Sequence, residues 1–458
     1  MRAREIARAV ADGTLDPVAL AGETTRTCRE SQPRLNAFTI IDGMRAEADA
    51  RAVQARLHAG ETLPLAGVPL IVKDNIWAEG WPTTQGSKVY EGHVSPRDAL
   101  AVARARQAGA IVVGIGTCSE FASKGQTTTP LYGVTRHPDD PGLTPGGSSG
   151  GNSAAIGAGL VPLGLGTDGG GSSRRPPAHC GIVGFKPSYG AIAHPYGFPE
   201  PFWWLSCIAP MARDVADCVL LFEAVAGEDP ADPESRPVAP AFTGEPAGLR
   251  VAFAPKLGLD VPVDPDVEAA FGTAVVALSR AVSDLHEAAP EWPDARARQD
   301  LMASQFAGLA AFYGDRWRAE PELFDPDIGV QIERGLAMPA TTLAGAMESS
   351  LLVRRAAARF FADFDLLISP TTPCVAWSNT VSAPAEIGGM PVDPRGHAVF
   401  TPLFNHAWTP ALSVPCGRGR DNLPVGMQIV GPIGQDRKVL AFAAFAERVF
   451  AAAGLWSS

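Results

Sequence analysis

Three short segments of the chain combine nucleophilic or basic side chains with glycine, and together they could form one reaction centre. In residues 71–75 (IVKDN), a lysine directly follows residues 68–72, an apolar run that predicts a buried strand. A charged ammonium costs free energy in apolar surroundings, so a buried Lys73 would have a lowered pKa and could act as a neutral base. The alternative is a strand-end lysine that points to water, where most lysines lie.

The other two segments are rich in glycine: residues 146–151 (GGSSGG) and 166–174 (GTDGGGSSR). The second follows a predicted strand at 161–165, and three glycines precede Ser172. Glycines can present a row of backbone N–H groups without obstruction by side chains, which suits an oxyanion hole. The alternatives are a flexible linker for the first segment and a glycine turn for the second. The apolar residues on either side argue against a linker.

Two general motifs match inside these segments, and neither has the context it needs. Residues 146–150 match G-x-S-x-G, but the preceding HPDDPGLTP cannot form the buried strand that a nucleophile elbow requires. A G-x-G-x-x-G match begins at Gly164. A dinucleotide site would also need an acidic residue about twenty positions later, and none occurs between Asp168 and Glu200.

Segments with helical and strand patterns alternate along the chain, which predicts an α/β sheet covered by helices on both faces. The first sixty residues are predicted to be helical, and long helices are expected at 265–287, 298–320 and 340–363. Further strands are expected at 111–115, 249–254, 364–369, 411–415 and 427–430.

Composition narrows the class of protein. With 46% apolar and 19% charged residues, the chain can bury a large core, and a net charge of −11 argues against binding of nucleic acid. Charges interrupt the N-terminal segment, so we expect no secretory peptide. Residues 141–167 carry no charge, but they are rich in Gly, Ser and Pro, so we interpret them as buried or active-site chain and not as a membrane span. Seven scattered cysteines without a CxxC pair favour reduced thiols and a cytoplasmic location. The eight histidines show no ligand spacing, so no metal site is expected.

Taken together, the three segments resemble the amidase signature family. That family has a strand-end lysine in a VKDN context, a GGSSGG loop, and a GTDxGGSxR loop that leads to CGxxGxKP. Here these are residues 72–75, 146–151, 166–174 and 180–187. Supporting similarities lie at 35–38, 108–110, 120–122, 369–373 and 424–428.

The resemblance implies an α/β fold with a single large mixed, twisted sheet covered by helices. It implies one amidase domain over residues 1–458. Its parts would be N-terminal helices (1–60), a signature core (63–257), a helical variable region over the active site (258–360), and a C-terminal part that returns to the core sheet (361–458).

The resemblance also implies roles for single residues, without any cofactor. Ser172 would be the nucleophile, Lys73 the base, and Ser148, joined to Gly147 by a cis peptide bond, the proton relay between them. A serine hydroxyl is a weak nucleophile until a neighbouring group takes its proton, so this division of roles is physically sound. The remaining implied residues are the oxyanion donors Gly169, Gly170, Gly171 and Ser172, and the loop-ordering residues Ser149, Asp168 and Arg174.

An aromatic cluster lies between the signature region and the next helix. It is either packing of a proline-rich loop or an apolar wall for a substrate. As a wall it favours small aryl or alkyl amides, anilides or carbamates over highly charged substrates. The chain departs from the family pattern nearby, at Ser173, at 204–206 and at Ala209, which leaves the substrate open. The cluster consists of Tyr196, Phe198, Phe202, Trp203 and Trp204.

Two other functions remain open. The A subunit of the tRNA-dependent amidotransferase has the same signature; it would hydrolyse glutamine to supply ammonia to a partner enzyme. A non-catalytic binding module is the third possibility, against which the intact Lys73, Ser148 and Ser172 argue. For the stand-alone hydrolase we expect a small amide or carbamate as the only partner, apart from a possible homodimer.

Overall fold

The core of the protein is a mixed β-sheet of eleven strands, in a computed structural model that describes residues 1–294 and 300–456. The strand order is β1-β3-β2-β6-β8-β7-β14-β15-β11-β9-β10. The predicted α/β fold with one large mixed sheet is confirmed. The strands are β1 (Phe38–Ile41), β2 (Pro69–Lys73), β3 (Ile111–Gly116), β6 (Leu163–Asp168), β7 (Val183–Lys186), β8 (Cys207–Ala212), β9 (Arg250–Phe253), β10 (Asp284–Glu287), β11 (Leu366–Pro370), β14 (Ala411–Arg418) and β15 (Pro424–Val430). Two small hairpins are formed by β4 (Thr128–Thr129) with β5 (Gly133–Val134) and by β12 (Glu386–Ile387) with β13 (Met390–Pro391).

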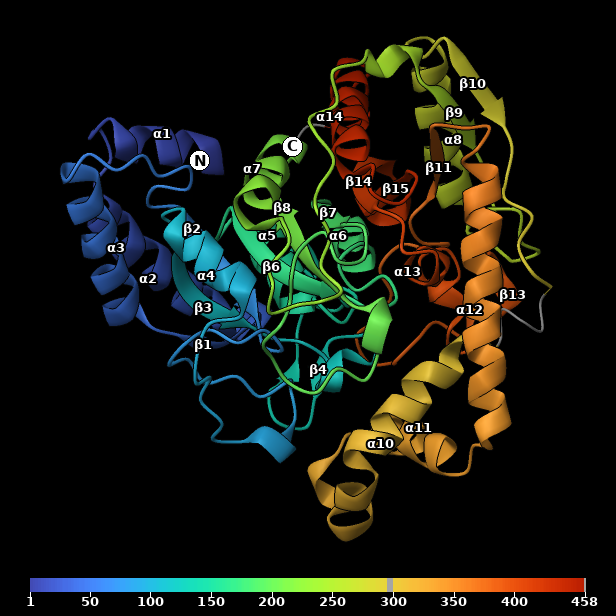
Figure 1. Cartoon of the computed structure of the whole chain (residues 1–458), viewed down its shortest axis with the longest axis horizontal. Helices are drawn as coiled ribbons and strands as arrows, with labels where there is room; N and C mark the ends of the chain where they lie inside the picture. Colours follow the sequence, from blue (N-terminus) through green and yellow to red (C-terminus); the bar gives the residue numbers. More distant parts are fainter. Residues whose placement is uncertain (295–299, 457–458) are drawn as a thin grey trace.

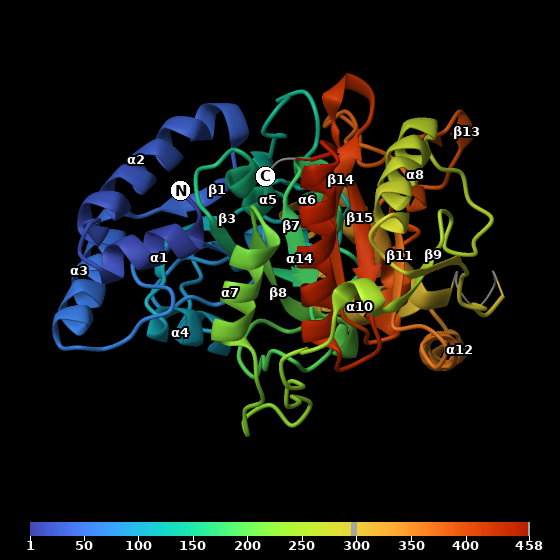
Figure 2. The ribbon, with the colours of Figure 1, turned by 90° about the horizontal axis from the view of Figure 1, so that it is seen from above.

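Helices pack on both faces of this sheet (Figures 1 and 2). Helices α5 and α6 contact each other and the central strands, while α7, α8 and α14 form a second layer. The central strands are buried along their whole length, so apolar residues fill them almost continuously. The helices are α1 (Ala3–Ala11), α2 (Pro17–Leu35), α3 (Gly43–His58), α4 (Leu100–Gln107), α5 (Gly150–Gly157), α6 (Arg175–Cys180), α7 (Val215–Val225), α8 (Pro265–Ser279), α10 (Ala303–Ala319), α11 (Pro326–Leu336), α12 (Ala340–Phe360), α13 (Pro402–His406) and α14 (Asp436–Ala452).

The register of β2 and β6 brings the three glycine- and lysine-containing segments to one edge of the sheet. Strands β2 and β6 are parallel neighbours, with Val72 opposite Leu165. Their carboxyl ends therefore lie at the same edge of the sheet, where β2 ends at Lys73 and β6 ends at Asp168. Helix α5 begins within the first glycine-rich segment, and α6 begins directly after the second. The three segments singled out in the sequence thus meet at one edge.

Several predicted elements differ from the structure. Residues 38–41 lie in a region predicted to be helical but form the edge strand β1, because α2 ends at Leu35 and the next residue, Asn36, adopts a left-handed conformation with φ 49°. Strand β6 continues to Asp168, three residues beyond its predicted end. The helix expected at 265–287 ends at Ser279, and β10 follows it. Of the helix expected at 298–320, residues 298 and 299 lie outside the described residues, and α10 spans Ala303–Ala319.

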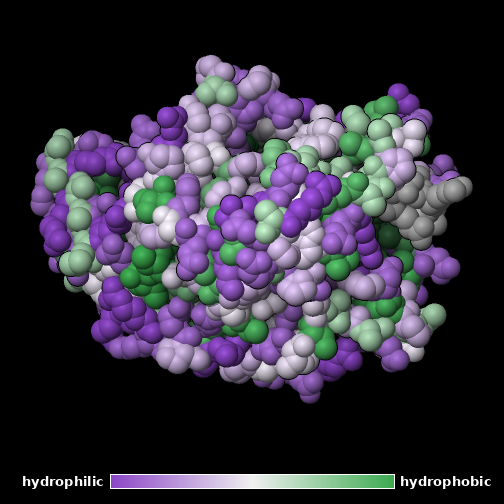
Figure 3. Space-filling view, turned by 90° about the horizontal axis from the view of Figure 1, so that it is seen from below, coloured by the Kyte–Doolittle hydropathy of each residue, from purple (hydrophilic) through white to green (hydrophobic). Residues whose placement is uncertain are grey.

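Helices α10 and α11 project from the sheet at the lower end of Figure 1. A small apolar cluster that includes Phe121, Tyr313 and Ile332 joins them to the core. Seen from below, this side of the molecule is mostly hydrophilic, with hydrophobic residues in small separate groups (Figure 3).

Within residues 1–294 and 300–456, no single helix is long and apolar enough to span a membrane. Only α11 and α12 together, bent by 103° at their junction, reach that length and composition.

Candidate active site

Lys73 lies at the end of β2 with its side chain fully buried. Its Nζ donates hydrogen bonds to Ser148 Oγ and to Thr167 Oγ1, both at 2.8 Å. Burial lowers the pKa of Lys73 from 10.5 to about 8, although the negative charges of Asp168 and Glu200 act in the opposite direction. A substantial share of the amine is therefore neutral near pH 8.

Ser148 lies in a loop that packing holds tightly. The Gly147–Ser148 peptide bond is cis, as the resemblance implies. A Cβ at Gly147 would lie 2.7 Å from the carbonyl oxygen of Lys124, so no larger residue fits there. Ser149 follows and donates from Oγ to the carbonyl of Thr167 at 3.4 Å. The loop thus presents the hydroxyl of Ser148 to Lys73.

Asp168 organises the loop that carries Ser172. Its carboxylate accepts hydrogen bonds from the backbone of Gly171 at 2.7 Å and from Ser173, and it forms an ion pair with Arg174 at 2.9 Å. Burial would favour the neutral acid, but the guanidinium of Arg174 holds the pKa of Asp168 well below its usual range. Both side chains are fully buried, so this ion pair anchors the loop to the protein interior.

The geometry corrects one expected oxyanion donor. The N–H of Gly171 donates to Asp168, so it cannot also hold an oxyanion. Among the described residues, no hydrogen bond outside regular secondary structure is donated by the backbone N–H groups of Gly169, Gly170 and Ser172. That these three groups bind the oxyanion stays a prediction. Ser172 itself is 5% exposed, at the end of the loop and three residues before α6.

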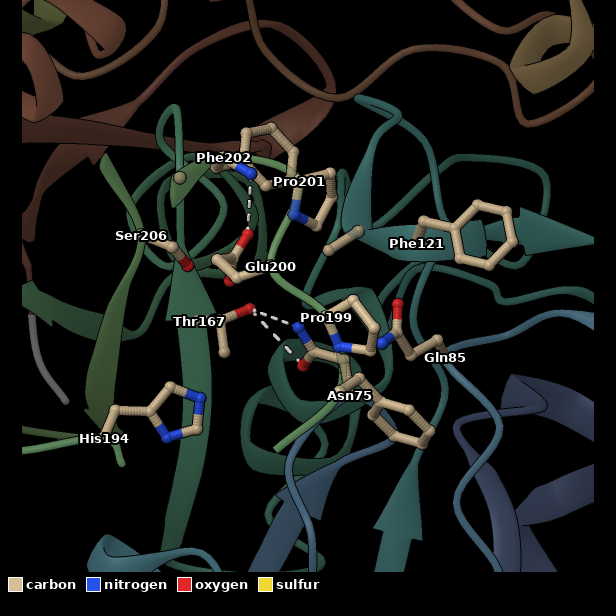
Figure 4. A pocket seen from close by; sticks show the side chains of 13 residues that line it. Asn75, Gln85, Phe121, Thr167, His194, Pro199, Glu200, Pro201, Phe202 and Ser206 are labelled. Atoms are coloured by element: carbon tan, nitrogen blue, oxygen red, sulfur yellow. Dashed lines mark hydrogen bonds between the residues drawn. The ribbon is translucent and has the colours of Figure 1, made fainter. Parts of the chain in front are cut away.

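Two residues of this polar network were not predicted. Thr167 accepts hydrogen bonds from Lys73 and, at 2.9 Å, from Asn75 Nδ2 (Figure 4). Side chains alternate between the two faces of a strand, so a predicted strand that reached Asp168 would have indicated which face Thr167 occupies. Asn405 on α13 donates to Asp168 and accepts from Arg174 at 2.6 Å. No sequence pattern indicates Asn405, because it is more than 200 residues away.

The predicted aromatic residues take different positions. Phe198 and Phe202 line a small cavity of about 20 Å³, together with Thr167 and Gly169. Figure 4 shows Phe202 and Thr167 at this cavity. Trp203 and Trp204 line a neighbouring cavity of about 280 Å³.

Tyr196 lies against the guanidinium of Arg97, at 4.7 Å from Cζ to the ring centroid, and it does not line either cavity. Glu200 lines both cavities, and burial raises its pKa. Among the described residues, no group of three or more His, Cys, Asp or Glu side chains could hold a metal ion.

Comparison with known proteins assigns the family. The family model described as Amidase matches residues 20–440. This chain belongs to the amidase signature family. Its members include relatives that are similar over nearly the whole chain, in sequence and in structure.

The A subunit of the glutamyl-tRNA(Gln) amidotransferase of Roseiflexus castenholzii is 35% identical over 94% of this chain and 91% of that protein. A solved bacterial aryl acylamidase superimposes with a TM-score of 0.89 at 26% identity, over 98% of this chain and 96% of that one. The solved A subunit of the Thermotoga maritima amidotransferase gives a TM-score of 0.74 at 26% identity, over 94% and 91% of the two chains. The chain is therefore an amidase-family hydrolase that acts on C–N bonds.

Proposed function

We propose that this chain hydrolyses small amides as a stand-alone enzyme, with Ser172 as nucleophile, Ser148 as proton relay and Lys73 as base. The observation that carries the proposal is the 2.8 Å hydrogen bond from Lys73 Nζ to Ser148 Oγ in a fully buried site. A lysine with a pKa near 8 can accept a proton through that bond at neutral pH, which an ordinary lysine rarely does.

In the proposed reaction, the proton of Ser172 Oγ passes to Ser148 Oγ while the proton of Ser148 passes to Lys73 Nζ. Ser172 Oγ attacks the carbonyl carbon, and the N–H groups of Gly169, Gly170 and Ser172 stabilise the negative oxygen. The same relay then returns a proton to the leaving nitrogen, and the C–N bond breaks. Water then gives a proton to Ser148 as Lys73 takes the proton of Ser148, and it attacks the acyl-enzyme. When the bond to Ser172 Oγ breaks and the acid leaves, the relay returns a proton to Ser172 Oγ.

The aromatic wall supports an anilide or a carbamate as substrate. Phe202 packs on the glycine loop, with its Cγ 2.9 Å from where a Cβ of Gly169 would lie. Phe198 lies against Tyr90 and His93, with ring centroids 4.8 and 4.9 Å apart. Of these two rings, Phe202 lies next to the proposed oxyanion site, and an aromatic ring at this position favours an aryl group on the substrate.

A second candidate is glutamine hydrolysis in an amidotransferase. The name and the 35% identity of the Roseiflexus protein favour it. At equal identity, the TM-score to the aryl acylamidase is higher than the TM-score to the Thermotoga protein, which favours the stand-alone enzyme.

The test is hydrolysis by the purified single chain of an anilide, an aliphatic amide, an aryl carbamate and glutamine. We expect turnover of at least one of the first three, lost in Ser172→Ala. Turnover of glutamine alone, or activity that requires further protein chains, would overturn the stand-alone proposal.

A further inference from the structure

Residues 119–126 form a connecting segment between the loop that carries Ser148 and the helices α10 and α11. Within this connecting segment, Phe121 and Ala122 have φ angles of 49° and 58°, which residues other than glycine rarely adopt. Such a conformation persists only where the surrounding structure enforces it. The contacts on either side of the connecting segment therefore decide whether it keeps its shape.

On one side, the connecting segment packs on the loop that carries Ser148. The carbonyl oxygen of Lys124 lies 2.7 Å from where a Cβ of Gly147 would be, so no side chain fits between the two backbones. Ser119 Oγ accepts a hydrogen bond from the N–H of Lys124 at 3.2 Å. The N–H of Ser119 in turn donates to the carbonyl oxygen of Ser148 at 3.4 Å. A displacement of Lys124 would therefore displace Ser148 as well.

On the other side, the ammonium of Lys124 forms an ion pair with the first turn of α11. The Nζ lies 2.7 Å from Asp325 and 3.2 Å from Asp327, and the side chain of Lys124 is buried. Asp325 caps α11 by accepting the N–H of Asp327 at 2.9 Å, and its own N–H donates to the buried carboxylate of Glu120 at 2.6 Å. Because a buried ion pair that loses one partner leaves an uncompensated charge, this contact holds Lys124 in place.

Side chains of both helices also hold the backbone of the connecting segment. Gln305 of α10 and Gln331 of α11 donate to the carbonyl oxygen of Ser123 at 3.3 and 3.4 Å. The ring of Phe121 stacks on Tyr313 of α10, with centroids 4.0 Å apart, inside the apolar cluster that joins these helices to the core. The position of α10 and α11 therefore determines the position of the connecting segment.

We propose that Lys124 is a positioning residue for the relay. Its ion pair with Asp325 fixes the connecting segment, and the connecting segment keeps Ser148 Oγ within hydrogen-bonding distance of Lys73 Nζ. The inference rests on the proposed function, because Lys124 has this role only if Ser148 relays the proton. Since a displacement of about 1 Å in an active site can lower the rate about 100-fold, the contact of α11 with Lys124 sets the rate of the reaction.

The test measures acylation of Ser172 by p-nitrophenyl acetate, an ester whose leaving group needs no proton, so that slow variants stay measurable. We expect Lys124→Met to lower the acylation rate constant about 10-fold, while the ester concentration at half-saturation changes little. Asp325→Asn keeps a helix-capping side chain and removes only its charge, so it should cause a smaller loss. The matched control is Lys438→Met, which breaks the 2.8 Å ion pair with Asp365 and should keep the wild-type rate.

The decisive comparison repeats Lys124→Met in the Ser148→Ala variant. If Lys124 acts through Ser148, its substitution should lower the residual rate less than about 2-fold there, because the group that it positions is gone. A full 10-fold loss in that variant would show that Lys124 supports the site in another way and would overturn the inference. A wild-type rate in Lys124→Met alone would also overturn it.

Melting temperatures of all variants separate lost positioning from lost folding, and every rate is measured well below them. If Lys124→Met does not fold, Asp325→Asn takes its place in the same comparison with Ser148→Ala, and the same outcomes decide. Failure of the proposed function gives a different result. Ser148→Ala would then acylate at the wild-type rate, which would remove the relay and the role of Lys124 together.

Discussion

The proposed base works only while its amine is neutral. The rate must therefore depend on the neutral fraction of Lys73, which the pKa of Lys73 sets at each pH. The value near 8 makes roughly 10% of the amine neutral at pH 7, against about 0.03% for a lysine at 10.5. The difference is a factor of roughly 300 in the active form, or about 3 kcal/mol. A lowered pKa means that the neutral amine forms at lower pH than in an ordinary lysine. We therefore expect kcat/KM to rise with pH through about 8 and then level off.

The assay is kcat/KM for an uncharged amide from about pH 6 to pH 10, at two temperatures. Ionisation of an amine depends strongly on temperature, whereas that of a carboxyl group does not. The rising limb should therefore move to lower pH on heating. A limb that stays in place would point to a carboxyl such as Asp74, whose pKa burial raises to about 7. A limb near pH 10, or near-normal turnover by Lys73→Ala, would refute the reasoning.

Three further predictions follow from single contacts. Thr167→Val removes an acceptor that favours charged Lys73, so the rising limb should move down by roughly one pH unit; an unmoved limb would show that the 2.8 Å bond does not affect the pKa. Asp168→Asn leaves Arg174 buried without its charge partner, so urea denaturation should show a loss of about 3–5 kcal/mol; a loss under about 1 would contradict this. Gly147→Ala forces a Cβ to within 2.7 Å of a backbone oxygen, so kcat should fall about 100-fold; unchanged kcat would show that the loop can adjust.

Local patterns were sufficient to predict the fold class and the three segments of the site. The apolar run before Lys73 forms β2, and the glycine-rich segments lead into α5 and α6. The same patterns did not predict the edge strand β1, because it is only four residues long. They also did not predict the end of β6, where glycine, threonine and aspartate continue a buried strand. Composition alone favours a loop for such residues.

Long-range contacts account for the rest of the site. Asn405 completes the hydrogen bonds of Asp168 from 237 positions away. Gly171 is indistinguishable from its glycine neighbours in the sequence, and only the hydrogen bond to Asp168 shows that its N–H is already used.

The central claim is that Ser172 carries the acyl group. The most direct measurement is intact-protein mass after reaction with an aryl carbamate that acylates quickly and deacylates slowly. We predict one carbamoyl adduct per chain, on the peptide that contains Ser172, slowed in Ser148→Ala and absent in Ser172→Ala. An adduct on another residue, or one that persists in Ser172→Ala, would contradict the account.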